Sequence, residues 1–102
     1  MAIIDITVIP IGTETPSVSE YVAEIHKVLK KYEGEIKYQL TPMSTLIEGD
    51  LKQLLDVVRE IHEVPFQKGI QRVATNIRID DRRDRESTME GKLKAVSEKM
   101  GD

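Results

Sequence analysis

The order in which hydrophobic periodicity changes along the chain constrains its fold more than any other feature. Apolar side chains alternate with polar ones in some segments, as in half-buried strands, and recur every third or fourth residue in others, as in amphipathic helices. The strand-type segments are 3–11, 35–41, 45–48 and 71–80, and the helix-type segments are 17–32, 50–69 and 87–100. The predicted order of elements is therefore β-α-β-β-α-β-α.

This order predicts an α+β fold of the ferredoxin-like type. In that βαββαβ sandwich two helices cover one face of an antiparallel sheet, and here a C-terminal helix is added. A chain of 102 residues is long enough for one domain and too short for two, so residues 1–102 are expected to form a single domain. With three Tyr, one Phe and no Trp, the core is expected to be aliphatic.

Local signals predict where the helices begin and end. Ser17 to Glu20 matches a capping box, and Gly34 suits a left-handed stop. Asp50 is the expected N-cap of the second helix. Pro65 is expected to kink or end that helix, because its ring clashes with the preceding turn, and Gly69 is the firmer stop.

The third helix is expected to begin at Ser87 or Thr88. Gly91 weakens it by about 1 kcal/mol relative to alanine, so we expect that it needs docking to persist. Its apolar side consists of Met89, Leu93, Val96 and Met100.

The two faces of the predicted sheet differ in composition. Ile4, Ile6 and Val8 form an all-apolar side that the first two helices would cover. The opposite side carries a mixed set of residues, namely Thr7, Ile9, Gln39, Thr41, Asn76 and Arg78. A ligand platform, an interface between subunits and a plain solvated face all remain open for this mixed side.

Charge and composition exclude several classes of function. The net charge is −3 and the pI is near 5.4, so there is no basic excess for nucleic acid. There is no cysteine, which removes disulfides and thiolate chemistry and is typical of a cytoplasmic protein. No signal-peptide pattern is evident, and no apolar run approaches the ~20 residues of a membrane span.

No catalytic constellation is evident either. His26 and His62 lie on different predicted helices, and neither belongs to a metal-ligand repeat. Nucleophile-elbow, Walker and Rossmann glycine patterns are missing. The expectation is a protein that is not an enzyme and that uses no metal and no cofactor.

Two further segments have two interpretations each. Residues 80–86 contain four acids and three bases, which predicts either a solvated loop of ion pairs or an anion or partner contact at Arg82 or Arg83. Residues 41–45 place hydroxyls beside a methionine thioether, which suits a flat heteroaromatic ring. From composition alone a simple turn is favoured there.

Four stretches together resemble a known family. They are Thr41-Pro42-Met43-Ser44-Thr45-Leu46-Ile47-Glu48-Gly49, Ser17-Val18-Ser19-Glu20-Tyr21-Val22, Ile79-Asp80-Asp81-Arg82-Arg83-Asp84 and Thr88-Met89-Glu90-Gly91-Lys92. In this order and spacing the chain resembles the thiamine-binding protein family, the YkoF-like group. The resemblance implies a ferredoxin-like fold, assembly into a dimer of dimers, binding of thiamine or its hydroxymethylpyrimidine moiety, and no catalysis.

The resemblance also implies candidate ligand contacts, at Thr41, Met43, Thr45, Ser17 and Ser19. Glu48 and Asn76 are added on chemical grounds, because an aminopyrimidine offers an N–H₂ donor and ring-nitrogen acceptors. The alternative function is a structural or regulatory homo-oligomer that contacts a partner protein through the mixed sheet face and the 80–86 loop.

Overall fold

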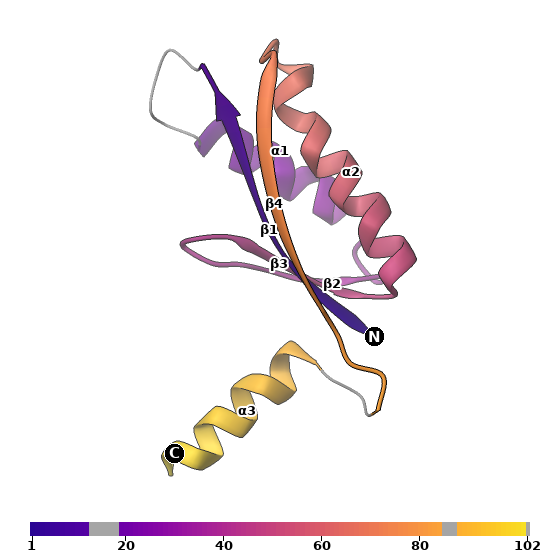
Figure 1. Cartoon of the computed structure of the whole chain (residues 1–102), viewed down its shortest axis with the longest axis vertical. Helices are drawn as coiled ribbons and strands as arrows, with labels where there is room; N and C mark the ends of the chain where they lie inside the picture. The colour runs from indigo at the N-terminus through magenta and orange to yellow at the C-terminus, as the bar shows by residue number, and fades with distance from the viewer. Residues whose placement is uncertain (13–18, 85–87, 102) are drawn as a thin grey trace.

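The computed structural model describes residues 1–12, 19–84 and 88–101 of the chain (Figure 1). Its elements are β1 (Ala2–Ile11), α1 (Ser19–Lys30), β2 (Lys37–Leu40), β3 (Thr45–Gly49), α2 (Leu51–Gln67), β4 (Arg72–Asp81) and α3 (Met89–Met100). The predicted order of strands and helices is confirmed.

The four strands form one antiparallel sheet in the order β2-β3-β1-β4. In this register Ile4 of β1 lies between Ile47 of β3 and Ile79 of β4. The preceding residue, Ile3, lies between Glu48 and Asp80. Because successive side chains on a strand point to opposite faces, these two rows belong to the two sides of the sheet. This is the predicted ferredoxin-like arrangement, with α3 as the C-terminal addition.

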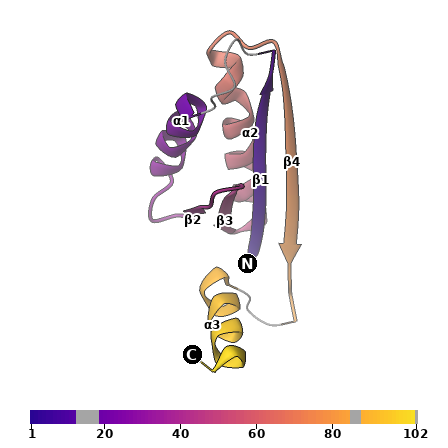
Figure 2. The same ribbon diagram turned by 90° about the vertical axis from the view of Figure 1, so that its left-hand side faces the viewer.

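One face of the sheet packs against α1 and α2, which lie together on the same side of it (Figure 2). The side chains of Ile4, Leu29, Ile47, Leu54 and Ile61 are at most 1% exposed there. Fully burying a side chain of this kind contributes about 1.5–3 kcal/mol. The predicted aliphatic core is therefore present on the helix-covered side.

The end of α2 departs from one expectation. Pro65 does not end the helix, which continues to Gln67. Pro65 lies in the last turn, so the helix loses a single interior hydrogen bond, and the proline ring is fully buried. The stop expected at Gly69 is correct: its φ is +90°, and its N–H donates to the Phe66 carbonyl at 3.1 Å.

The helix starts follow the sequence signals only in part. Asp50 occupies the N-cap of α2, but its side chain makes no capping hydrogen bond. Thr88, rather than Ser87, caps α3, because its hydroxyl accepts the Gly91 N–H at 2.8 Å. The capping box expected at Ser17 lies outside the described residues.

α3 lies beyond the lower end of the sheet, apart from α1 and α2 (Figures 1 and 2). None of its residues is buried, and Leu93, Val96 and Met100 are 63%, 55% and 69% exposed. The expected docking of its apolar side within the subunit is thus confined to its first turns. Within the described ranges, no helix combines the length and the hydropathy needed to cross a bilayer.

Candidate ligand-binding site on the open sheet face

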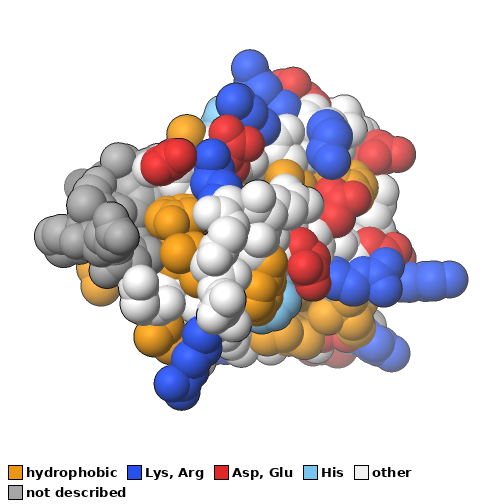
Figure 3. Space-filling view, turned by 90° about the horizontal axis from the view of Figure 1, so that it is seen from above, with side chains coloured by type: hydrophobic (Ala, Val, Ile, Leu, Met, Phe, Trp, Pro, Cys, Tyr) orange, Lys and Arg blue, Asp and Glu red, His pale blue; other side chains and the backbone are white. Residues whose placement is uncertain are grey.

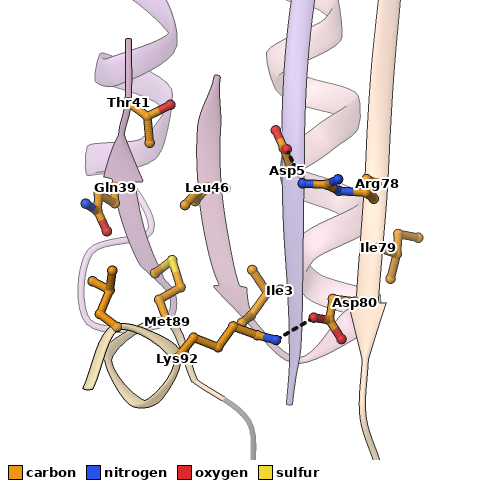
Figure 4. A pocket seen from close by; sticks show the side chains of 11 residues that line it. Ile3, Asp5, Gln39, Thr41, Leu46, Arg78, Ile79, Asp80, Met89 and Lys92 are labelled. Carbon is orange, nitrogen blue, oxygen red and sulfur yellow. Dashed lines mark hydrogen bonds and ion pairs between the residues drawn. The ribbon is translucent and has the colours of Figure 1, made fainter. Parts of the chain in front are cut away.

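The first turns of α3 and the open face of the sheet line two adjoining cavities, which are open to solvent on one side. Figure 4 shows the first of them. The first, which we call the Arg78 cavity, has a volume of about 730 Å³, and the second, the Glu48 cavity, has about 550 Å³. Gln39, Met89 and Leu93 line both. Each volume is within the range of small-molecule sites.

The Arg78 cavity combines an apolar floor with ion pairs at its edge. Ile3 and Leu46 supply the apolar floor from β1 and β3. Figure 4 shows Arg78 reaching across to Asp5, with Nη2 and Oδ2 3.1 Å apart. Lys92 of α3 pairs with Asp80 of β4 at 2.8 Å, which ties the helix to the edge of the sheet.

The Glu48 cavity contains a buried carboxylate. Glu48 is 1% exposed, and neither of its oxygens has a hydrogen-bond partner among the described residues. The neighbouring Lys37 is opposite Glu48 in the register, but its ammonium group lies 3.7 Å from Glu90 instead. Buried polar groups in proteins are generally hydrogen-bonded, so this side chain is open to a donor from elsewhere.

The charge lining the two cavities is unbalanced. The lining contains three cationic side chains and five carboxylates, and the carboxylates are Asp5, Glu33, Glu48, Asp80 and Glu90. An excess of one sign in a concave surface concentrates ligands of the opposite sign. The arrangement therefore favours a cationic ligand or one rich in N–H donors.

Thr41 and Glu48 are the two predicted ligand contacts that line these cavities. The Thr41 hydroxyl is engaged in the β2–β3 turn, where it donates to the Ser44 carbonyl at 2.8 Å and accepts the Ser44 N–H at 3.0 Å. It therefore organises the hairpin, as the simple-turn interpretation of residues 41–45 expects.

The other predicted contacts are more dispersed. Met43 is 84% exposed in the turn between β2 and β3. Thr45 is opposite Ile6, so it lies on the helix-covered face rather than beside the cavities. Asn76 is on the open face, two residues before Arg78 on β4. Ser17 lies outside the described residues, and Ser19 is the first residue of α1.

Several cavity residues were not among the predicted contacts. Gln39 and Arg78 already belong to the predicted mixed face, so their alternation with core residues was the available signal. Asp5 could have been found in the same way. Lys92 could not, because its role depends on where α3 meets the sheet, and helical periodicity carries no such information.

The charged segment after β4 pairs internally. Arg82 donates to Asp84 at 2.6 and 3.0 Å, and Arg83 donates to Asp81 at 3.1 and 2.8 Å. The hydrogen bonds from Arg83 are the main reason that the pKa of Asp81 is lowered. Because both guanidinium groups are already engaged, the interpretation as a loop of ion pairs is favoured over an anion site.

Each histidine has a structural neighbour. His62 Nδ1 lies 2.6 Å from the Thr75 hydroxyl, which links α2 to β4, and its ring is edge-on to Phe66. His26 is edge-on to Tyr38 at a centroid distance of 5.7 Å. In the described part of the chain, no three acidic or histidine side chains converge as a metal site.

Fold and site together define a small α+β protein with a ligand-sized hollow beneath its C-terminal helix. A family profile described as thiamine-binding protein matches residues 4–97. The chain belongs to the thiamine-binding protein family. It is similar to the Bacillus subtilis protein YqgV, with 64% identity over 98% of both chains.

Solved structures share this fold. The hypothetical protein MJ1052 of Methanocaldococcus jannaschii superposes with a TM-score of 0.83 at 37% identity, over 95% of this chain and 96% of that one. A Thermotoga maritima protein provisionally assigned to thiamine biosynthesis or salvage shares the fold, with a TM-score of 0.75 at 21% identity over 93% of this chain and 97% of its own.

Proposed function

We propose that this protein is a non-enzymatic, cytoplasmic binding protein for thiamine or its hydroxymethylpyrimidine moiety, and that the ligand occupies the hollow beneath α3. The observation that carries the proposal is the 730 Å³ Arg78 cavity on the open sheet face, in a chain of the thiamine-binding protein family. That family is described by binding rather than by a reaction.

The chemistry of the hollow supports this ligand class. Thiamine carries a fixed positive charge on its thiazolium ring, and the hollow carries an excess of carboxylates. Ile3, Leu46 and Met89 offer an apolar surface on which a flat ring can lie. The Gln39 side-chain amide has both donors and an acceptor for the polar edge of a pyrimidine.

The structure supports some of the predicted ligand contacts more than others, according to where each residue lies relative to the hollow. Thr41 and Glu48 line the hollow, and Asn76 lies on the same face of the sheet. Met43 and Thr45 remain predictions that require the ligand, or a second subunit, to reach the hairpin turn. Ser17 and Ser19 remain predictions as well.

Titration calorimetry with thiamine and with hydroxymethylpyrimidine tests the proposal. We expect Gln39→Ala to weaken binding about two- to tenfold, the effect of losing one hydrogen bond of ~0.5–1.5 kcal/mol. Gln67→Ala is the matched control, because Gln67 is an exposed glutamine on α2, away from the open face. The absence of both heat and thermal shift at millimolar ligand would contradict the proposal.

We further propose that the protein assembles as a homo-oligomer, with a dimer of dimers as the expected form. Exposed apolar side chains motivate this, and they are Ile9, Ile11, Ile77, Ile79, Leu93, Val96 and Met100. The edge strand β4 adds ten residues with one unpaired side, which invites pairing with another chain. The end of the molecule opposite α3 also presents hydrophobic side chains among charged ones (Figure 3).

Light scattering tests the assembly. A strict monomer at micromolar concentration would contradict it, and it would also remove the alternative function as a structural or regulatory oligomer. If an oligomer forms and no ligand binds, that alternative becomes the better account of the mixed sheet face. The internal ion pairs of Arg82 and Arg83 give little support to the 80–86 loop as its contact surface.

A further inference from the structure

Glu48 is the one charged side chain that is buried among the residues described. Its neighbours across β3 are Ile3, which has no donor in its side chain, and Lys37, which is paired with Glu90. An ionised carboxylate is an acceptor with two oxygens and about four lone-pair sites. The groups on its own face of the sheet therefore leave its hydrogen-bonding capacity unused.

The missing partner must present hydrogen-bond donors rather than acceptors. The amino group of a 4-aminopyrimidine donates one N–H, and the adjacent ring nitrogen donates a second when it is protonated. Two parallel bonds of this kind match the geometry of a carboxylate, as a guanidinium fork does. A 4-oxo analogue places a carbonyl oxygen where the amino group was, and that oxygen repels Glu48.

Both carboxylate oxygens of Glu48 are shielded from solvent in this structure. A ligand would therefore reach them from the cavity that Glu48 shares with α3. Met89 and Leu93 of α3 line the same cavity as Glu48. The helix buries none of its residues, and its ion pairs through Lys92 and Glu90 are exposed. Exposed pairs contribute little, about 0–1 kcal/mol each, so the first turn of α3 can shift at small cost.

We propose that Glu48 is the specificity-determining residue of this site, and that it selects an amino-substituted pyrimidine over the corresponding oxo-pyrimidine once the first turn of α3 moves aside. This inference rests on the proposed binding function, and it names the group of the ligand that the site recognises, the 4-amino group of the pyrimidine. A site built to hydrogen-bond one group discriminates strongly against an analogue that lacks it, because buried polar groups are then left unpaired.

The test compares 4-amino-5-hydroxymethyl-2-methylpyrimidine with its 4-oxo analogue by calorimetry. We expect the wild-type protein to prefer the amino compound at least about tenfold, which corresponds to ~1.4 kcal/mol. Glu48→Gln should abolish that preference. Glu63→Gln is the matched control, since Glu63 is an exposed glutamate on α2, away from the open face, and it should leave the preference unchanged.

A second readout separates recognition from a structural role. Removing a buried, unpaired charge should stabilise the free protein, so the melting temperature of Glu48→Gln should rise by about 4 °C or more. Should that variant fail to fold, Glu48→Asp answers the same question, because the shorter side chain withdraws the acceptor and should lower the preference for the amino compound.

Two outcomes would overturn the inference. They are an unchanged preference for the amino compound in Glu48→Gln, and a wild-type protein that binds both pyrimidines equally. In both cases the binding function stands. Failure of the wild-type protein to bind either pyrimidine or thiamine would instead contradict the binding function itself.

Discussion

The two faces of the same sheet have opposite characters. On the side of α1 and α2, Ile4, Ile47 and Leu54 are completely buried in an aliphatic core. On the side of α3, the equivalent positions carry ion pairs, a glutamine and the buried Glu48, beneath a helix that buries nothing of its own. The comparison indicates that one face holds the fold together and the other is available for binding.

This division is possible because alternate residues of one strand serve different faces. Ile4 and Ile6 of β1 enter the core, while Ile3 and Asp5, which alternate with them along the strand, line the Arg78 cavity. Substitutions on the open face can therefore change the ligand site without removing core contacts. The experiments below test this difference between the helix-covered face and the open face of the sheet.

The largest contrast is expected between two leucines. Leu54→Ala should lower the free energy of unfolding by about 2–5 kcal/mol, because it opens a cavity in the core. Leu93→Ala removes the same atoms from a side chain that is 63% exposed, and it should change stability by less than about 0.5 kcal/mol. Urea denaturation of both variants measures the difference.

A large loss of stability in Leu93→Ala would mean that α3 is packed in solution. We would then infer that a second subunit packs against the apolar side of α3. In that case the loss should diminish on dilution, because the population of assembled subunits falls.

A contrast of intermediate size is expected between thiamine and thiamine diphosphate. The added phosphates bring negative charge to a hollow whose described lining is already rich in carboxylates. We expect the diphosphate to bind at least about tenfold more weakly at low salt, and we expect the gap to narrow as salt screens the charges. Calorimetry at two ionic strengths measures it, and tighter binding of the diphosphate would contradict the electrostatic argument.

The smallest effect is expected at the link between α3 and the sheet. A double-mutant cycle of Asp80→Asn and Lys92→Met should give a coupling free energy of about 0.2–1 kcal/mol, because both side chains are roughly half exposed. Chemical denaturation measures the cycle, and amide exchange in α3 should accelerate in both single variants. A coupling well above this range would make α3 a fixed wall of the cavity rather than a movable one.

Much of the fold was predictable from local patterns. The alternation in residues 71–80 identified β4 together with its two faces, and Gly69 marked the end of α2. Pro65 was expected to kink or end α2, and the helix continues past it to Gln67, because a proline in the last turn removes a single hydrogen bond.

The candidate site was predictable only in part. Glu48 was chosen for its chemistry, but its burial and its lack of a partner depend on what lies across the strands. Thr45 illustrates the opposite case, because a motif that is contiguous along the chain is divided between the two faces of the sheet. Sequence proximity therefore placed residues together that the pleat of β3 separates.

The sequence by itself determined the order of strands and helices, the aliphatic core and the absence of a basic surface, because these follow from local periodicity and from composition. Only the tertiary structure decided which side chains meet. The cavities beneath α3 join residues of β1, β2, β3, β4 and α3 that are far apart along the chain. Their charge balance and the isolation of Glu48 arise from packing across strands, which no local pattern encodes.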